Sequence, residues 1–493
     1  MSAEAAAQIR WGPVVAGLVG ALAILVIDSP LHHYGEHGDR PAHAAAVTFL
    51  MAAWWLTEAV PIQWTALVPI LTFPFLTVVP GGFFDRVTSA ARPYIDPYIF
   101  LFLGGMCIAA AMQQWGLHRR IAVRIMATVG TDPKRLLLGV LAGTAFVSMW
   151  ISNTATAAMM LPIALSVVLE LERQSGGTRL VGYGASTMLA VAYGANIGGI
   201  GTKIGTAPNT QFAQFMSGIG VEVGFLQFMA VGLPFVVLFI PFTWWLLWTT
   251  GRGDAPSSVA GERVIAEAEK QLGPMSRGEW IVLGVFCTTA GLWMAGSPLT
   301  ALVAPEFTDF KVTGAMVEGT IAMTAALFLL LCRVQGQAAL ALRSLRLVPW
   351  DTLVLLGGAF SMAAAVQSSG LSRCLGDQLS GLSAQSLPVQ VFIASFATVA
   401  LSAFTSNTAT TGVMLNVLRD AVSAHGLTTV LFAATIAASC DFALPAGTPP
   451  NAIVFGSGYL TVSRMVRTGL VLDVAAAALA AAWCLVAVPI VFG

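Results

Sequence analysis

Two nearly identical stretches decide how this chain folds: residues 148–156 read SMWISNTAT, and residues 402–410 read SAFTSNTAT. A second pair follows in the same order, with GTAPN at residues 205–209 and GTPPN at residues 447–451. The offset is 254 residues for the first pair (406 − 152) and 242 for the second (447 − 205). Matches that keep their order at similar offsets predict two repeated halves, each with one copy of both motifs.

The composition places both halves in a membrane. Of 493 residues, 57% are hydrophobic and only 10% are charged, whereas soluble proteins average about 25% charged residues. Lys and Arg (24) equal Asp and Glu (24), and the mean hydropathy is +0.80. So few charges exclude an ordinary soluble enzyme and a disordered chain, and the lack of a basic excess excludes nucleic acid as a partner. The sequence therefore predicts an all-α polytopic membrane protein surrounded by a lipid bilayer.

Eleven apolar segments approach or exceed the roughly 20 residues that a membrane-spanning helix needs. They are residues 11–29, 42–60, 61–80, 98–118, 183–215, 223–250, 279–296, 313–334, 348–371, 427–460 and 468–491. Two further apolar stretches, residues 136–170 and 387–418, are too long for one helix and too short for two crossings joined by a loop. Each has a Ser-Asn-Thr cluster near its middle, so we expect both to be re-entrant hairpins whose tips are covered by protein or water.

The Gly-Thr-x-Pro-Asn motifs interrupt two of the expected spans, residues 183–215 and 427–460. Proline removes a backbone donor and clashes with the preceding turn, so a helix breaks there. We therefore expect one broken helix near the membrane midplane in each half.

The expected domains are residues 1–60 (N-terminal spans), 61–250 (first repeat), 251–278 (a cytoplasmic linker) and 279–493 (second repeat).

The distribution of basic residues orients the chain. With the N-terminus inside, 17 of the 24 Lys and Arg residues lie on the cytoplasmic side, and Lys203 lies within the membrane. The six on the outer side are Arg40, Arg86, Arg92, Lys311, Arg373 and Arg419. This asymmetry follows the positive-inside rule, so we expect a cytoplasmic N-terminus and an outer C-terminus. The first hairpin then opens from inside and the second from outside, and inverted repeats with broken helices are typical of secondary transporters.

The motifs carry the chemistry to bind a cation and an anion together. Amide and hydroxyl oxygens suit a hard cation such as Na⁺, and amide N–H and hydroxyl groups can donate to a carboxylate. Freed carbonyls at a broken helix also bind cations, and the N-terminus of a half-helix attracts anions. We expect two sodium sites, the first formed by Ser148, Ser152, Asn153 and Gly205, and the second by Ser402, Thr405, Asn407 and Gly447. We expect the anionic substrate between the hairpin tips, bound by Asn153, Thr154, Thr206, Asn407, Thr408 and Thr448.

Simpler interpretations of the same motifs remain open. The Ser-Asn-Thr clusters would then only satisfy the backbone of two turns, and the Gly-Thr-x-Pro-Asn motifs would only kink their helices. The duplication of both motifs favours the binding interpretation, because two matched breaks that each follow a hairpin are a feature of transporter sites.

The motif set resembles that of the divalent anion/sodium symporters, a family of dicarboxylate, citrate and sulfate transporters. Residues 55–62 (WLTEAVPI) resemble the family's segment at the end of its second helix, and residues 439–454 (SCDFALPAGTPPNAIV) resemble its C-terminal signature. The resemblance runs from about residue 50 to the end of the chain. It implies eleven spans, two re-entrant hairpins, a homodimer and an elevator motion that carries the site across a fixed scaffold. It also implies C4 dicarboxylates such as succinate, malate and fumarate as substrates, Na⁺ as the coupling ion, and a bacterial inner membrane as the location.

Two charged residues depart from the family pattern. Lys203 stands where many members have an uncharged residue, and Asp441 stands where a small neutral residue is expected. Charges at this depth usually mark function, so both are candidates for coupling. In one interpretation Lys203 replaces a sodium ion, with Asp441 as its pair; in the other it caps carbonyls at the break or reaches toward the membrane edge.

Two alternatives to a Na⁺ symporter follow. The first is a sodium-independent or proton-linked dicarboxylate exchanger, which Lys203 would favour. The second, a membrane-embedded enzyme, is remote because the spans lack a reciprocal Asp pair, a Ser–His dyad and a zinc motif. No G-x-x-x-x-G-K-[ST] motif occurs, so we expect no ATP and no other organic cofactor.

Overall fold

The computed structural model describes residues 9–493 apart from residues 28, 30, 33–37, 256–260, 308–310, 372, 373, 375–379 and 446. Arg373, one of the six basic residues expected on the outer side, and part of the expected linker lie outside the described residues.

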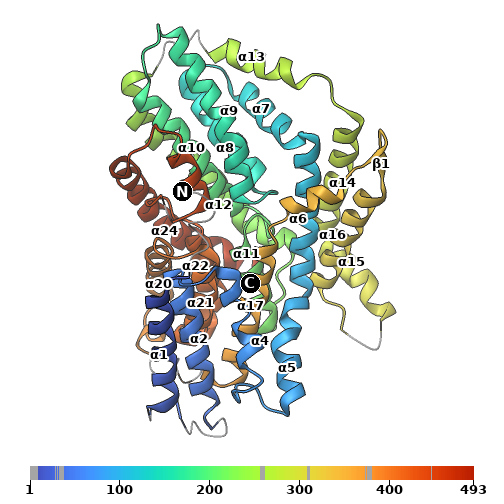
Figure 1. Cartoon of the computed structure of the whole chain (residues 1–493), viewed down its shortest axis with the longest axis vertical. Coiled ribbons are helices and arrows are strands. Elements are labelled where there is room, and N and C mark those ends of the chain that lie inside the picture. The colour runs from blue at the N-terminus through green and yellow to red at the C-terminus, as the bar shows by residue number, and fades with distance from the viewer. Residues whose placement is uncertain are drawn as a thin grey trace.

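Helices make up nearly all the regular structure that is described (Figure 1). The N-terminal part contains α1 (Trp11–Val26), α2 (Arg40–Thr57), α3 (Ile62–Thr65), α4 (Val68–Thr72), α5 (Phe83–Ala91), η3 (Arg92–Ile95), α6 (Pro97–Trp115) and α7 (Leu117–Val129). The first copy of the motifs lies on α8 (Pro133–Ser148), α9 (Asn153–Gln174), α10 (Val181–Gly199), α11 (Ala207–Gly218) and α12 (Phe225–Gly251).

The middle of the chain links the two copies. It contains η4 (Arg252–Asp254), α13 (Gly261–Leu272), α14 (Arg277–Met294), α15 (Gly296–Val303), η6 (Ala304–Glu306), α16 (Gly314–Leu331), β1 (Arg333–Val334), β2 (Gln337–Ala338), η7 (Leu342–Leu347), α17 (Trp350–Ser368) and α19 (Ser380–Ser383). Strands β1 and β2 pair antiparallel, with Arg333 opposite Ala338. The second copy lies on α20 (Leu387–Ser402), α21 (Asn407–Ala421), η8 (Ala424–Gly426), α22 (Leu427–Ala438), α23 (Pro449–Phe455) and α24 (Val462–Phe492).

Six helices of the described chain are long and apolar enough to cross a membrane, or seven if the bent pair α14 and α15 counts as one span. These six include α9, α12, α16, α17 and α24. The prediction of an all-α membrane protein is therefore confirmed. The count of eleven spans stays a prediction, because several expected spans are short or interrupted helices.

Residues 61–80 differ from their expected form. They do not form one long helix but two short ones, α3 and α4, followed by turns. Pro69 stands at the start of α4, and Pro74 and Pro80 follow it, so the backbone donors that a continuous helix needs are missing at three positions. The positions of the prolines, and not the apolar composition, therefore determine the length of the helices in this segment.

Both Ser-Asn-Thr motifs turn the chain at the expected residues. Helix α8 ends at Ser148 and α9 begins at Asn153, and likewise α20 ends at Ser402 and α21 begins at Asn407. A proline lies in the first turn of α8 and of α20, where its missing N–H and fixed φ suit a helix start. The two helices of each turn contact one another, so each motif forms the tip of a helical hairpin.

Both Gly-Thr-x-Pro-Asn motifs interrupt their helices as expected. The chain leaves the helical conformation between α10 and α11, and again between α22 and α23. Each second half-helix starts directly after the Thr of the motif, with proline in its first turn. The motif therefore sets where the second half-helix begins.

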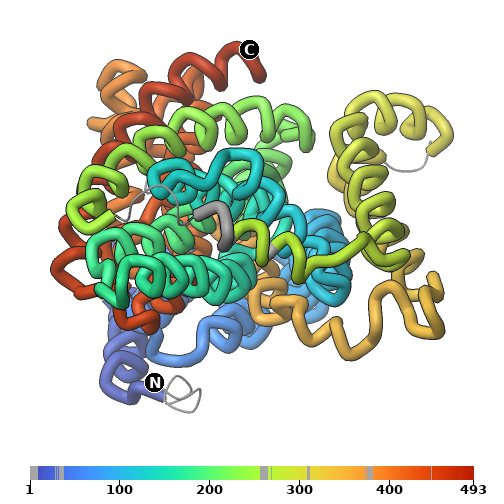
Figure 2. Tube along the Cα trace, turned by 90° about the horizontal axis from the view of Figure 1, so that it is seen from above, coloured from blue at the N-terminus to red at the C-terminus, as the bar shows by residue number. Residues whose placement is uncertain are grey.

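The two copies pack in a matching pattern. Within each copy, the first hairpin helix contacts the first half-helix, α8 with α10 and α20 with α22. Between copies, the second hairpin helix contacts the other copy's second half-helix, α9 with α23 and α21 with α11. Each hairpin thus contacts half-helices of both copies. Helices α14 to α16 form a separate group to one side, most clearly in Figure 2, and they contact the rest mainly through α6.

Candidate functional site

The tip of the first hairpin is fixed by one serine. The Ser148 hydroxyl donates to Asn153 Oδ1 at 2.8 Å and is also within 2.8 Å of the Ala195 carbonyl on α10. The Ser152 hydroxyl caps α9 by accepting from the backbone N–H of Ala155 at 3.4 Å. Asn153 is half-buried, and its carboxamide packs against Gly199, where a Cβ would collide with it. The amide is therefore held between the hairpin tip and the end of α10.

The tip of the second hairpin repeats this arrangement. The Ser402 hydroxyl lies 3.0 Å from Asn407 Oδ1 and 2.6 Å from the Ala438 carbonyl on α22. The Ser406 hydroxyl accepts from the backbone N–H of Ala409 at 3.3 Å and so caps α21. The same five-residue spacing between serine and asparagine thus has the same geometry in both halves.

The breaks are also held in the same way. Asn209 Nδ2 donates to the carbonyls of Gly199 (2.9 Å) and Thr202 (2.7 Å). At an offset of 242 residues, Asn451 Nδ2 donates to the carbonyls of Asp441 (3.3 Å) and Leu444 (3.0 Å). A break leaves backbone carbonyls without the N–H donors that a continuous helix would supply. The asparagine of each motif donates to two of these carbonyls.

Asn196 joins the two breaks, and the sequence interpretation missed it. From α10, its Nδ2 donates to the Asp441 carbonyl at 3.3 Å and to Thr448 Oγ1 at 3.1 Å. Its Oδ1 has no hydrogen-bond partner among the described residues. An asparagine inside an apolar helix was the available signal, but it lies outside both repeated motifs.

The hydroxyl groups expected to bind substrate differ in access. Thr154 is exposed, Thr206 and Thr408 are half-buried, and Thr448 is buried and caps α23. Thr405 is buried, and its hydroxyl is hydrogen-bonded to that of Thr410. Of these hydroxyl-bearing residues, Thr154 is therefore the most accessible. No described hydrogen bond joins Asn153 to Asn407.

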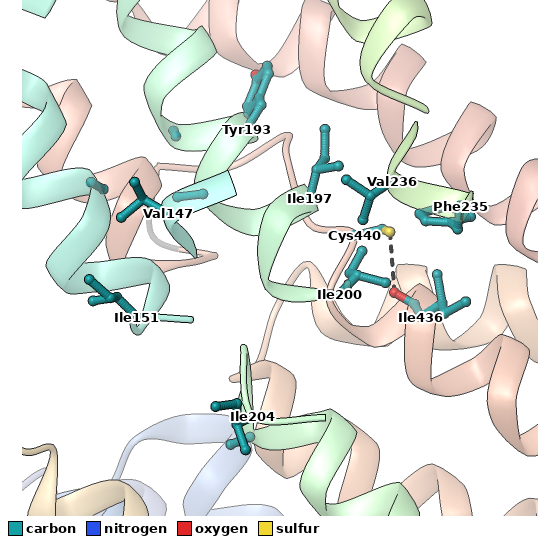
Figure 3. Close-up of a cluster of buried hydrophobic side chains, with 14 of the residues drawn as sticks. Val147, Ile151, Tyr193, Ile197, Ile200, Ile204, Phe235, Val236, Ile436 and Cys440 are labelled. Atoms are coloured by element: carbon teal, nitrogen blue, oxygen red, sulfur yellow. Dashed lines mark hydrogen bonds between the residues drawn. The ribbon is translucent and has the colours of Figure 1, made fainter. Parts of the chain in front are cut away.

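Apolar side chains enclose the breaks. Figure 3 shows Ile197 and Ile200 near the end of α10, beside Val236 of α12 and Cys440 of the second break. All four are buried. Polar groups at the breaks therefore lie in a setting of low polarity, where an ion–dipole contact is stronger than in water.

Two cavities lie near the hairpins. A cavity of about 70 Å³ touches the second tip, where Thr405 and Thr410 line it. A larger one of about 700 Å³ lies between α7, α9 and α13, with Arg119, Glu170 and Arg173 on its wall. None of the predicted site residues lines the larger cavity, so volume alone does not locate the site.

Lys203 has a different partner from the one suggested by sequence. Its Nζ lies 2.6 Å from Glu318 Oε2 on α16, and both side chains are 1% exposed. Glu318 Oε1 also accepts from the backbone N–H of Phe225 at 2.9 Å, and the Lys203 ammonium lies 5.2 Å from the centre of the Tyr98 ring. The suggested pair of Lys203 with Asp441 is therefore wrong. Glu318 was not among the predicted residues, although a single carboxylate within an apolar span was a signal.

The arrangement fits a cation and a carboxylate. Each tip asparagine directs its Oδ1 toward a serine hydroxyl, which leaves its two Nδ2–H groups as donors. The first N–H groups of α9 and α21 lie at the same tips, and a helix N-terminus favours negative charge. Serine, asparagine and backbone oxygens provide the neutral, hard ligands that Na⁺ accepts.

Comparison with known proteins gives a consistent result. The sodium:sulfate symporter transmembrane region family matches residues 15–489. The sodium-dependent dicarboxylate transporter SdcS of Staphylococcus saprophyticus is 33% identical over 471 residues, which cover 93% of this chain and 88% of that protein. SdcS of Staphylococcus aureus strain USA300 is 33% identical over 490 residues, which cover 97% and 92%.

A solved structure shares the fold. The Alcanivorax borkumensis YdaH transporter superposes with a TM-score of 0.58 at 14% sequence identity, over 90% of this chain and 99% of that one. Because the identity is so low, this likeness concerns the arrangement of helices alone.

Proposed function

Because the chain belongs to the sodium:sulfate symporter family, the divalent anion/sodium symporters identified from its motifs, we propose that it carries C4 dicarboxylates across the membrane together with Na⁺. The family consists of transporters, so the chain is not an enzyme and the membrane-embedded enzyme is set aside. The relatives named sodium-dependent dicarboxylate transporters support the substrate class and the coupling ion. Within that class we propose succinate, malate and fumarate.

The proposal depends above all on one observation: both hairpin tips hold an asparagine by the same serine contact. In the proposed site, the Nδ2–H groups of Asn153 and Asn407 donate to the two carboxylates of the substrate. The hydroxyl groups of Thr154, Thr206, Thr408 and Thr448 complete the donor set. A C4 dicarboxylate has a charged group at each end, which matches donors supplied from two tips.

Sodium ions would be held beside the same amides. We propose that Ser148, Ser152, Asn153 and the backbone at Gly205 hold one ion. Ser402, Thr405, Asn407 and the backbone at Gly447 would hold the other. Burying the negative charge of the substrate in this apolar setting costs free energy unless bound cations neutralise part of it. Binding of the anion would therefore depend on binding of Na⁺.

A sodium-independent exchanger is the weaker candidate. It requires Lys203 to supply a permanent positive charge in place of Na⁺. Glu318 neutralises that charge at 2.6 Å, so the pair brings no net charge to the first break. The proposed symporter therefore uses sodium ions at both tips, and in this state of the transporter Lys203 is the partner of Glu318 on α16.

Transport requires the site to face each side in turn, and we propose an elevator motion. Helices α8 to α12 and α20 to α24 contact one another extensively and contain the motifs, so they are the proposed moving unit. Helices α1 to α6 and α14 to α17 are the proposed scaffold, and a homodimer would anchor it. The expected domain limits, the cytoplasmic N-terminus and the outer C-terminus in a bacterial inner membrane belong to the same proposal.

Ligand-dependent thermal stability tests the proposal. We expect succinate to raise the melting temperature of the detergent-purified protein in NaCl, and to raise it much less in choline chloride, because the anion site needs cations. Butylamine, which lacks both carboxylates, serves as the control ligand. Equal stabilisation by succinate in both salts would contradict sodium coupling, and no stabilisation in either would contradict the substrate class.

A further inference from the structure

Asp441 lies in the second break with no exposed surface. Neither of its carboxylate oxygens has a hydrogen-bond partner among the described residues. Its Oδ2 lies against the backbone of Gly447, so closely that no Cβ would fit on that glycine. A carboxylate is therefore directed at the backbone that was expected to hold the second cation.

The charge balance around Asp441 is incomplete. The buried ion pairs described elsewhere, Lys203 with Glu318 and Arg120 with Glu279, are each neutral. No described ion pair involves Asp441 or its neighbour Asp473, whose Oδ1 accepts from the backbone N–H of Phe442 at 2.8 Å. A buried carboxylate without a partner is costly, and a bound cation removes that cost.

Other oxygens near Asp441 also lack donors. Asn196 reaches this loop through its bond to the Asp441 carbonyl, yet its Oδ1 has no partner in the described part of the chain. The Ser439 hydroxyl, two residues before Asp441, is buried and likewise without a partner there. Carboxylate, amide and hydroxyl oxygens together are ligands for a hard cation.

The two halves differ at this point. By the 242-residue offset that relates Asn209 to Asn451, the counterpart of Asp441 is Gly199, which has no side chain. Gly199 packs against the neutral amide of Asn153. The first break thus offers only neutral amide, hydroxyl and backbone oxygens, whereas the second also offers the carboxyl group of Asp441.

We propose that Asp441 is a carboxylate ligand of the second cation, a hard monovalent ion such as Na⁺. This inference rests on the proposed sodium-coupled function and deepens it. Attraction to a buried carboxylate does not depend on substrate, so this site binds Na⁺ first and without dicarboxylate. The first site, which has only neutral ligands, gains most of its affinity for Na⁺ once the dicarboxylate is bound.

The test uses Na⁺ alone. The melting temperature of the full-length purified protein is followed as NaCl replaces choline chloride at constant ionic strength, without dicarboxylate. We expect the wild type to be stabilised, and Asp441→Asn to need at least about tenfold more Na⁺ for half the effect, because a neutral amide of nearly equal size replaces the charged group. Asp441→Glu, which keeps the charge, should retain part of the wild-type response. Asp473→Asn is the matched control, and we expect a smaller shift from it than from Asp441→Asn.

Three results would overturn the assignment. One is the same Na⁺ requirement in Asp441→Asn as in the wild type. Another is an equal shift in Asp473→Asn, which would show that net charge matters and that Asp441 is no ligand. If Asp441→Asn does not fold, binding of ²²Na⁺ to the wild type is measured without dicarboxylate. The absence of such binding is the third result that would overturn the assignment. Na⁺-driven succinate uptake by the wild type tests the proposed function separately, so the two failures are distinguishable.

Discussion

Ser148 and Ser402 each place the amide of an asparagine five residues later, and this contact decides what the tips can bind. Each hydroxyl lies within hydrogen-bond distance of two acceptors, the Asn Oδ1 and a carbonyl of the neighbouring helix, at Ala195 and Ala438. The amide orientation is therefore set by two elements and not by the turn alone. Within the described part of the chain no hydrogen bond from Nδ2 of Asn153 or Asn407 is found, so these N–H groups are available to a ligand, which a simple turn would not need.

Removing either amide should abolish transport and leave the fold intact. Asn153→Ala or Asn407→Ala deletes donors to a carboxylate, and hydrogen bonds to charged groups contribute about 1.5–3 kcal/mol each. We expect succinate affinity to fall roughly 10- to 150-fold. Ser166→Ala on α9 is the control, because that residue is exposed and the Pro162 carbonyl is the one hydrogen-bond partner of its hydroxyl among the described residues. Wild-type uptake by either asparagine variant would remove these residues from the site.

Loss of the Lys203 ammonium should destabilise the folded protein. Lys203→Met leaves Glu318 charged and buried, and breaking a buried pair on one side costs about 3–5 kcal/mol. We expect a clear fall in melting temperature. At least half of it should be recovered in Lys203→Met/Glu318→Gln, where the introduced amide oxygen can still accept from the backbone N–H of Phe225. The Na⁺ concentration for half-maximal uptake should stay unchanged in the double variant. A changed Na⁺ requirement in the double variant would contradict the structural role of Lys203 and return it to the coupling mechanism.

At the scale of the element, the broken helices depend on their own asparagines. Asn209 and Asn451 each supply donors to two carbonyls of the preceding break, so their loss leaves two buried acceptors unsatisfied. Each buried unsatisfied group costs about 1–3 kcal/mol. A break in a membrane-embedded helix is stable only because these bonds replace the missing helical ones.

We therefore expect Asn209→Ala and Asn451→Ala to lower the melting temperature more than Asn416→Ala. Asn416 is also buried, but the one hydrogen bond of its Nδ2 in the described structure is local, to the Gly412 carbonyl one turn earlier. The comparison keeps the size of the deletion constant and changes only the bonds that are lost. Equal effects in all three variants would show that the breaks do not rely on these amides.

The sequence predicted the elements better than their contacts. Helices end and begin at the Ser-Asn-Thr and Gly-Thr-x-Pro-Asn motifs because proline and N-cap residues act locally, whereas the re-entrant course of the two hairpins stays a prediction. Residues 61–80 form two short helices and not one long helix, because an apolar composition does not reveal where Pro69, Pro74 and Pro80 interrupt a helix. Glu318 was missed because it lies far in sequence from the motifs. Asn196 was missed because Ala438 stands at its place in the second half, so the repeat gives no signal there.

At the scale of the whole molecule, the proposed moving unit meets the scaffold near the first break. A Cβ built on Gly105 of α6 would lie 3.8 Å from the Cβ of Ile204, which follows α10. That spacing matches the mean Cβ separation of about 3.8 Å in disulfides. The two residues belong to elements that must slide past one another in an elevator.

Gly105→Cys/Ile204→Cys should therefore block transport when oxidised. We expect uptake to fall to background under oxidising conditions and to return with reductant, because the crosslink joins the two units in one state. Each single cysteine variant serves as the control for reaction with the six native cysteines. Full transport by the crosslinked protein would contradict movement between α6 and the first break.

Uptake of radiolabelled succinate into proteoliposomes tests the central claim of sodium-coupled dicarboxylate transport most directly. Inward gradients of Na⁺, K⁺ or H⁺ would be imposed separately, each with and without unlabelled dicarboxylate inside. We predict accumulation that requires the Na⁺ gradient and needs no internal dicarboxylate. Uptake that ignores Na⁺ and depends on internal dicarboxylate would contradict the account and identify an exchanger.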